Sequence, residues 1–163
     1  MESLEIFRRL HEAHARYALV GAMALIFQGV EIAYTHDLDL AVSLAASDRT
    51  AIVEALRDVH PTPPRARVVP PWDEFSLRGP WTKVMTDFGE IDFLVTLPGI
   101  EDGFEGVYAR ADVFELKGIP VRVACLDDLA AMKRASTRPK DRMHLDAIEA
   151  VRRLAREGGA GAN

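Results

Sequence analysis

The sequence lacks several features that would assign it to a specialised class of protein. It contains a single cysteine, Cys125, so no disulfide can form within the chain, and we expect a reducing compartment. No apolar run approaches the roughly 18 residues that a membrane-spanning helix needs. The opening residues MESLEIFRRL are charged and amphipathic, and they lack the apolar core of a signal peptide. These absences predict a soluble, cytoplasmic protein.

Positive charge is also scarce. The 20 Lys and Arg residues are outnumbered by 25 Asp and Glu residues, which leaves a net charge of −5 at pH 7. This balance argues against tight binding to long duplex nucleic acid, which depends on phosphate neutralisation, but it leaves room for a local basic patch. With 163 residues, 48% hydrophobic and 28% charged, the chain has an ordinary globular composition. We expect one domain over residues 1–157 and a disordered tail at 158–163.

The pattern of apolar residues predicts strands mixed with helices. Helical spacing is found over residues 2–14, 22–29 and 47–59, and either Ser47 or Asp48 is expected to cap the last of these helices. Strands are expected at 17–20, 37–43, 75–79, 82–89 and 90–99, and residues 111–126 alternate like a hairpin around Gly118. Two helices are expected at the end of the chain, at about 127–136 and 139–156.

The order of these elements predicts the fold class. Because strands and helices do not alternate regularly, we expect an α+β (mixed α/β) fold, in which a small mixed sheet is flanked by helices and a helical segment follows at the C-terminus. Residues 60–72, HPTPPRARVVPPW, are rich in proline and therefore predict an exposed loop rather than a central strand or helix.

The stretch YTHDLDLAV, residues 34–42, carries the first chemical signal. Because side chains alternate along a strand, Asp37 and Asp39 share one face while Leu38 and Leu40 occupy the other. Two carboxylates about 6.6 Å apart along a strand repel each other unless a cation or water separates them. Mg²⁺ takes such carboxylates as ligands together with substrate phosphates. The pair therefore indicates either a metal site or an exposed edge strand with two solvated aspartates.

Four further residues are candidates for a site that binds a metal ion and phosphate. Gly21 follows an apolar strand and precedes a short helix, so the backbone there can approach a phosphate closely. Asp92 lies in the apolar strand at 90–99, where a lone carboxylate is costly unless it is paired or metal-bound. Lys133 and Lys140 supply positive charge, and lysine is a common point-charge partner for phosphate. The alternatives are a tight turn, an edge-strand charge and solvated surface lysines.

Taken together, these segments resemble the minimal nucleotidyltransferases of the DNA polymerase β superfamily, and most of all the small prokaryotic group that includes abortive-infection-type nucleotidyltransferase toxins. That family has an apolar strand ending in Gly-Gly or Gly-Ser, a short helix, a T-x-D-h-D strand (h apolar), an h-D-h strand, and a late segment with L-x-D-L-x-x-x-K and R-x-K-D. The corresponding residues here are Val20-Gly21-Ala22, Thr35 to Asp39, Ile91-Asp92-Phe93, LDDLAAMK at 126–133 and RPKD at 138–141. The resemblance covers about Tyr17 to Leu154.

The resemblance implies a two-metal nucleotidyl transfer from a nucleoside triphosphate such as ATP. It implies that Asp37, Asp39 and Asp92 hold two Mg²⁺ ions and are the catalytic carboxylates, with Asp92 helping to deprotonate the acceptor hydroxyl. The nucleotide-binding residues that it implies are Gly21, Ala22, Thr35, Lys133 and Lys140, and Lys140 is favoured over Lys133 because it lies in RPKD. The implied acceptor is an RNA such as tRNA, a protein or a small molecule. The implied setting is a toxin–antitoxin pair, with a cognate antitoxin as partner and no membrane.

Two departures from the family pattern leave other hypotheses open. Ala22 replaces the second small residue, so no hydroxyl is available for phosphate there, and no arginine precedes Thr35, where many relatives carry one. These departures favour a catalytically degenerate module of the same fold that binds a nucleotide or a partner. A D-x-D glycosyltransferase is a third candidate, but it needs a nucleotide-binding α/β half before the motif, and only 36 residues precede Asp37.

Overall fold

The computed structural model describes residues 3–33 and 35–160, and it describes side chains up to residue 157. The strands are β1 (Ala18–Val20), β2 (Leu38–Ala41), β3 (Trp81–Thr86), β4 (Gly89–Leu94), β5 (Asp112–Leu116) and β6 (Ile119–Val123). The helices are α1 (Ser3–Glu12), α2 (Gly21–Phe27), α3 (Ala46–Leu56), α4 (Gly103–Arg110), α5 (Leu126–Arg134) and α6 (Pro139–Ala160), with a 3₁₀ turn η1 (Arg57–Val59) after α3. The predicted mixed α+β class is confirmed.

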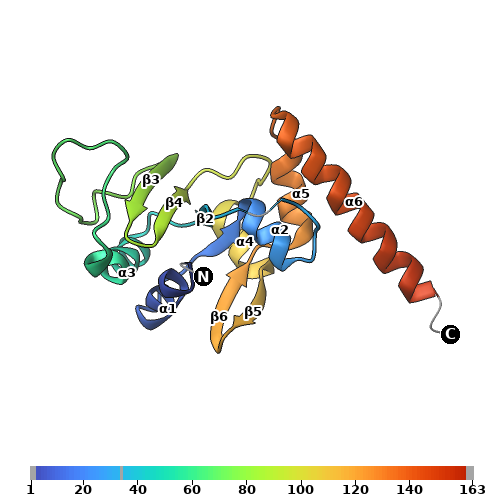
Figure 1. The fold of residues 1–163 in the computed structure, drawn as a ribbon, viewed down its shortest axis with the longest axis horizontal. Helices are drawn as coiled ribbons and strands as arrows, with labels where there is room; N and C mark the ends of the chain where they lie inside the picture. Colours follow the sequence, from blue (N-terminus) through green and yellow to red (C-terminus); the bar gives the residue numbers. More distant parts are fainter. Residues whose placement is uncertain (1–2, 34, 161–163) are drawn as a thin grey trace.

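The strands form one six-stranded sheet in the order β3-β4-β2-β1-β6-β5 (Figure 1). The outer pairs β3–β4 and β5–β6 are antiparallel hairpins, and β1 pairs antiparallel with β2. The remaining pairs, β2–β4 and β1–β6, are parallel. The short central strands are buried because Leu19 and Leu40 pack into the core. The sheet is therefore mixed, with its most buried strands in the middle.

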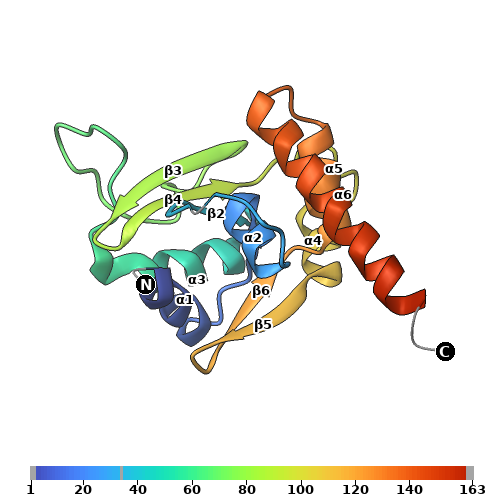
Figure 2. The ribbon, with the colours of Figure 1, turned by 45° about the vertical axis from the view of Figure 1, so that its right-hand side comes forward.

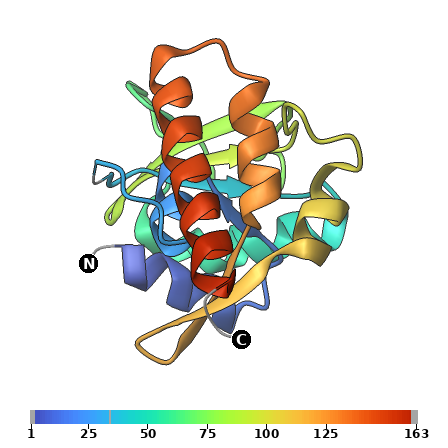
Figure 3. The ribbon, with the colours of Figure 1, turned by 90° about the vertical axis from the view of Figure 1, so that its right-hand side faces the viewer.

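Helices cover the sheet in two groups. α1 buries Ile6, Phe7 and Leu10 and packs against α3, and Figure 2 shows these two helices together below β3 and β4. α5 and α6 pack against each other and lie side by side in Figure 3. The C-terminal end of α6 extends away from the rest of the fold (Figure 1). No described helix is both long enough and apolar enough to cross a membrane.

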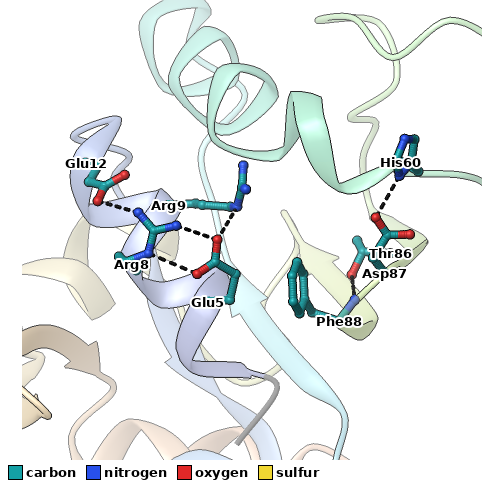
Figure 4. Close-up of polar contacts among 8 residues, drawn as sticks. All are labelled: Glu5, Arg8, Arg9, Glu12, His60, Thr86, Asp87 and Phe88. Carbon is teal, nitrogen blue, oxygen red and sulfur yellow. Dashed lines mark hydrogen bonds and ion pairs between the residues drawn. The ribbon is translucent and has the colours of Figure 1, made fainter.

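Figure 4 shows two groups of polar contacts, one within α1 and one at the β3–β4 turn. On α1, the Arg8 guanidinium donates to the carboxylates of Glu5 and Glu12, one helical turn away on either side. At the β3–β4 turn, His60 Nδ1 lies 2.6 Å from Asp87 Oδ2, which joins the turn to the segment after α3. Ion pairs that are wholly or partly exposed contribute at most about 1 kcal/mol each, so these contacts add little to stability.

Most of the predicted elements are confirmed, including the strand around Asp92 and the hairpin around Gly118. Two details were wrong. Residues 75–79 are irregular instead of a strand, and a turn precedes them because the Asp73 carboxylate accepts a hydrogen bond from the Phe75 N–H. Neither Ser47 nor Asp48 caps α3, which begins after Ala45 without a side-chain cap.

In the C-terminal half, one helix was not predicted and another is longer than predicted. α4 (Gly103–Arg110) was not predicted. α6 continues to Ala160, past its expected end at Arg156, so the start of the predicted disordered tail is helical. The last part of that tail, 161–163, lies outside the described residues.

Candidate functional site

The register of the sheet brings two predicted carboxylates together. Asp39 on β2 is the direct partner of Asp92 on β4, and Asp92 is in turn the partner of Lys83 on β3. Neighbouring strands lie about 4.8 Å apart, so paired side chains on one face are closer than residues two apart along one strand. The register therefore pairs Asp39 with Asp92 across β2 and β4, although the two residues are far apart in the sequence.

Asp39 is the member of this pair whose ionised carboxylate is disfavoured by its surroundings. Its carboxylate is half-buried and accepts no hydrogen bond from the part of the chain that the structure describes. Burial, which is the largest cause, and the negative charge of Asp92 together raise the pKa of Asp39 to about 6, against the opposing positive charge of Lys133. A cation bound beside Asp39 would stabilise the ionised carboxylate.

Asp92 is held from the opposite side by β3. Trp81 Nε1 donates to Asp92 Oδ1 at 2.9 Å, and Lys83 Nζ donates to Asp92 Oδ2 at 3.1 Å. Lys83 also forms an ion pair with Glu90, which is two residues before Asp92 on the same strand face. Both oxygens of Asp92 thus have protein partners. The contacts from Trp81 and Lys83 were not predicted: Lys83 lies in the strand expected at 82–89, and Trp81 lies just before it.

Asp37 and Thr35 lie just before β2. Asp37 is exposed, and its backbone N–H lies 3.3 Å from Thr35 Oγ1, so the threonine hydroxyl turns the chain into the strand. Among the described residues, no group of three or more His, Cys, Asp and Glu side chains is arranged as a metal site. The structure therefore brings Asp39 and Asp92 together and leaves Asp37 at the exposed edge.

Gly21 forms the corner between β1 and α2, directly against Asp39. It adopts a φ of +70°, and a Cβ placed on it would lie 2.0 Å from Asp39 Oδ2. A residue with a side chain would meet both a strained backbone and an overlap with the carboxylate. Ala22, the next residue, is half-buried at the start of α2. The corner needs glycine because the Asp39 carboxylate occupies the space that a side chain would fill.

A cavity of about 360 Å³ lies beside this corner. Its polar lining is Gly21, Asp39, Lys133, Ser136, Thr137, Arg138 and Asp141, and its apolar lining includes Leu94, Leu129 and Met132. Most of the polar residues come from the end of α5 and the turn into α6. The cavity thus combines a carboxylate on one wall with basic and hydroxyl side chains on the other.

Asp141 fixes the basic wall of this cavity. It is buried, and it accepts hydrogen bonds from Lys133 Nζ at 2.6 Å, Ser136 Oγ at 2.5 Å and Arg138 Nε at 2.9 Å. Burial alone would raise the pKa of Asp141, but the hydrogen bonds from Lys133 and Ser136 outweigh burial and lower this pKa to about 2. Asp141 therefore positions Lys133 at the cavity. This role was not predicted, and Asp141 entered the sequence analysis only as part of RPKD.

The two predicted phosphate-binding lysines have different positions. Lys133 lines the cavity and acts electrostatically on Asp39. Lys140 is exposed on the first turn of α6 and lies outside the cavity lining. The structure thus brings Lys133 to the site and leaves Lys140 in solvent.

The donor set beside Gly21 fits a hard divalent cation. Mg²⁺ prefers carboxylate oxygens, and Asp39 presents a half-buried carboxylate that lacks a hydrogen-bond donor among the described residues. Asp92 is the neighbouring oxygen ligand by strand register, and Asp37 is close enough to act on the pKa of Asp39. As they stand in the described chain, these three aspartates do not form a metal site, so a bound cation would have to draw them together.

Comparison with known proteins supports the fold. No family model matches the sequence, and no curated protein matches it. Among solved structures, the chain is similar to a candidate nucleotidyltransferase from Thermotoga maritima, with a TM-score of 0.53 and 14% sequence identity. The match covers 97% of this chain and 85% of that one. At this identity the similarity shows the fold alone, and the predicted nucleotidyltransferase fold is confirmed.

Proposed function

We propose that the chain is a Mg²⁺-dependent nucleotidyltransferase, which moves a nucleoside monophosphate from a nucleoside triphosphate to an acceptor hydroxyl. The observation that carries the proposal is the register of Asp39 with Asp92, next to a cavity with Lys133 and Arg138 on its other wall. Such a site offers negative charge to a metal and positive charge to phosphates, and this combination supports the proposal. The similarity of the fold to a candidate nucleotidyltransferase supports the proposal.

In this proposal, different residues bind the triphosphate and the metal ions. Lys133, held by Asp141, and Arg138 neutralise the triphosphate, while the backbone at Gly21 allows a phosphate to approach Asp39 closely. Asp37, Asp39 and Asp92 hold the divalent cations. Bound divalent cations neutralise charge on the reacting phosphate and make the acceptor hydroxyl more acidic.

The proposed reaction is one displacement at phosphorus. The acceptor oxygen forms a bond to the α-phosphorus, the bond from that phosphorus to the bridging oxygen breaks, and pyrophosphate leaves. The proton of the acceptor hydroxyl passes to the carboxylate of Asp92. Thr35, Ala22 and Lys140 stay predictions of nucleotide contact, and Thr35 already shares its hydroxyl with the Asp37 N–H.

Label transfer tests this function. The chain is incubated with α-labelled nucleoside triphosphates, Mg²⁺ or Mn²⁺, and separate pools of RNA, protein and small-molecule acceptors. We expect label on one pool, and we expect Asp39→Asn to reduce the rate by at least about a hundredfold, because a metal contributes several kcal/mol to such a transfer. Asp146→Asn is the matched control, since Asp146 is an exposed aspartate on α6. Absence of transfer to every pool, with unchanged nucleotide binding in Asp39→Asn, contradicts the proposal.

A second candidate is a degenerate module of the same fold that binds a nucleotide without turnover. The contacts of Trp81 and Lys83 favour it, because they occupy both oxygens of Asp92. Calorimetry that finds nucleotide binding without label transfer would support this candidate. Lys83→Met separates the two: a gain of transfer shows that Lys83 restrains a competent site, while continued inactivity with intact nucleotide binding supports degeneracy.

The role of a toxin in a toxin–antitoxin pair rests on the resemblance of the sequence alone. We propose that expression of the chain arrests bacterial growth through nucleotidyl transfer, and that a cognate antitoxin relieves the arrest. Growth curves of cells that express the wild type or Asp39→Asn test this role. Equal growth inhibition by both proteins would contradict it, because inhibition would then be independent of the site.

A further inference from the structure

A second cavity, of about 510 Å³, lies between β3 and the loop that precedes it. Its lining includes the aromatic residues Trp72, Phe75 and Trp81, together with prolines of the loop and the basic residues Arg78 and Lys83. Trp72 and Trp81 are the two tryptophans of the chain. Nothing in the proposed metal and triphosphate site uses this cavity, apart from the contacts of Trp81 and Lys83 with Asp92.

The loop that forms this cavity is built by specific contacts despite its lack of regular structure. Trp72 Nε1 donates to the Val53 carbonyl oxygen at 2.9 Å, which anchors the loop on α3. Arg78 Nε donates to the Phe75 carbonyl oxygen at 2.9 Å, and Thr82 Oγ1 donates to the Arg78 carbonyl oxygen at 2.8 Å. These bonds hold the wall of the cavity in one shape.

Two of the aromatic rings remain largely in solvent. Phe75 is 67% exposed and Trp81 is 52% exposed. Large apolar side chains that gather at the surface of a cavity indicate a binding site, since leaving them in water is unfavourable. Flat, exposed rings held by a fixed backbone are suited to stacking against another flat ring.

Basic residues gather near these rings in a chain whose net charge is −5, and one acidic residue, Asp73, lines the cavity with them. Arg65 and Arg67 are the only charged residues between Asp58 and Asp73 if histidine is neutral, and both are exposed. Arg65 also lines a hollow that shares Trp81 and Lys83 with the aromatic cavity. Arginines beside stacking rings are the combination that binds unpaired bases and their phosphates.

We infer that this aromatic cavity binds an unpaired base of a single-stranded nucleic acid, with the adjacent phosphates on Arg65 and Arg67. The base stacks on the rings of Phe75 and Trp81. Because Trp81 Nε1 donates to Asp92, the cavity adjoins the carboxylate that would take the acceptor proton. The bound strand is thus the acceptor of nucleotidyl transfer, and this last step rests on the proposed function.

Intrinsic fluorescence reports on this cavity directly, because both tryptophans of the chain line it. The protein is titrated with a short single-stranded RNA, the matching single-stranded DNA and the corresponding duplexes, in EDTA and without nucleoside triphosphate. We expect both single strands to quench the tryptophan fluorescence with an affinity that falls as salt rises, and we expect the duplexes to bind at least tenfold more weakly.

Variants with matched controls locate the binding. Phe75→Ala is expected to weaken single-strand binding by about 5- to 100-fold, the range expected for loss of one base stack. Val113→Ala, an exposed apolar residue on β5, is its control and is expected to bind as the wild type does. The double variant Arg65→Gln/Arg67→Gln is expected to lower both the affinity and its dependence on salt. Its control removes Arg153 and Arg156 from the far part of α6.

The inference is overturned by no quenching with either single strand, by duplexes that bind as tightly as single strands, or by Phe75→Ala that binds as the wild type does. An equal loss in the Arg153→Gln/Arg156→Gln control also overturns it, because binding would then follow net charge alone. Failure here is distinguishable from failure of the proposed function. Nucleoside triphosphate binding at Asp39 is measured separately with Mg²⁺, and it does not depend on Phe75.

Discussion

Two aspartates that line the same cavity have opposite environments. Asp141 is buried and accepts three hydrogen bonds, from Lys133, Ser136 and Arg138, and its pKa falls to about 2. Asp39 is half-buried and accepts none from the described residues, and burial with the charge of Asp92 raises its pKa to about 6. Burial acts in the same direction on both carboxylates, so the hydrogen-bond donors make the difference.

The comparison separates a structural carboxylate from a functional one. The charge of Asp141 is compensated within the protein, so this residue joins α5 to α6 and holds Lys133 in place. The charge of Asp39 is compensated only weakly, so its ionised form gains most from a cation supplied from outside. A strongly raised pKa in a cavity is also typical of functional sites. Asp39 is therefore the residue on which the proposed metal site depends.

The largest expected effect on stability comes from breaking the compensated aspartate. Asp141→Asn leaves the largely buried ammonium group of Lys133 without its carboxylate, and we expect a loss of about 3–5 kcal/mol in the free energy of unfolding. Denaturant unfolding at pH 7 measures this loss. Asp127→Asn is the control, because the Asp127–Arg152 pair is exposed at its carboxylate and should contribute less than about 1 kcal/mol. Equal effects of the two substitutions would contradict a structural role for Asp141.

The second prediction concerns the glycine that touches Asp39. Gly29→Ala introduces a side chain at a φ of +77° with open space around it, so it should cost only the strain of about 1–2 kcal/mol. Gly21→Ala adds a clash with the Asp39 carboxylate to a similar strain, and we expect about 1–3 kcal/mol more. Thermal unfolding of the two variants measures the difference. Equal destabilisation would mean that the Asp39 carboxylate moves aside freely.

The third prediction concerns the dependence of stability on pH. Because the pKa of Asp39 is raised from 3.8 to about 6 by folding, its contribution to stability is fully present below about pH 4 and is lost as pH rises through 6. In EDTA, Asp39→Asn should therefore gain stability relative to the wild type between pH 4 and pH 7, by up to about 2 kcal/mol because the group is partly exposed. Urea unfolding at several pH values measures this gain.

Two comparisons make the pH experiment decisive. Asp146→Asn provides the baseline for removing an exposed carboxylate from the same chain. Addition of Mg²⁺ at pH 7 should stabilise the wild type and leave Asp39→Asn unchanged. If the difference in stability between Asp39→Asn and the wild type stayed constant from pH 4 to pH 7, the charge of Asp39 would have no effect on the free energy of unfolding.

The smallest expected effect is on nucleoside triphosphate affinity, and it concerns the two lysines that the sequence analysis predicted to bind phosphate. Lys140→Gln should change nucleoside triphosphate affinity by less than about threefold, because Lys140 is solvated outside the cavity. Lys133→Gln should weaken it by about tenfold or more, since it removes a charged donor from the cavity wall. Calorimetry measures both affinities, and circular dichroism checks that each variant is folded. A larger effect of Lys140→Gln would place the triphosphate on α6.

Local sequence signals were sufficient for the strands that carry the site. The alternation around Asp39 and the apolar surroundings of Asp92 predicted both strands, and the resemblance of ordered motifs predicted the fold that the comparison confirmed. The register that makes Asp39 and Asp92 partners could not be predicted, because it depends on the pairing of β2 with β4 across a long connection.

Elements held by tertiary contacts were missed. The sequence of α4, GFEGVYAR, contains two weak helix formers, but Arg110 at its end forms ion pairs with Asp102 and Asp128. The role of Asp141 depends on donors from α5 and the following turn, which meet only in the folded chain. Residues 75–79 alternate like a strand but follow Asp73, whose side chain closes a turn instead.

The most direct test of the account is metal-dependent nucleotide binding by the wild type and Asp39→Asn. Calorimetric titration with Mn²⁺ and a non-hydrolysable nucleoside triphosphate analogue measures this binding, with Asp146→Asn as the control. The account predicts that the wild type and the control bind the analogue only when the metal is present, and that Asp39→Asn binds it at least about tenfold more weakly. Equal affinity in all three proteins, with or without metal, would contradict the assignment of Asp39 as the centre of the site.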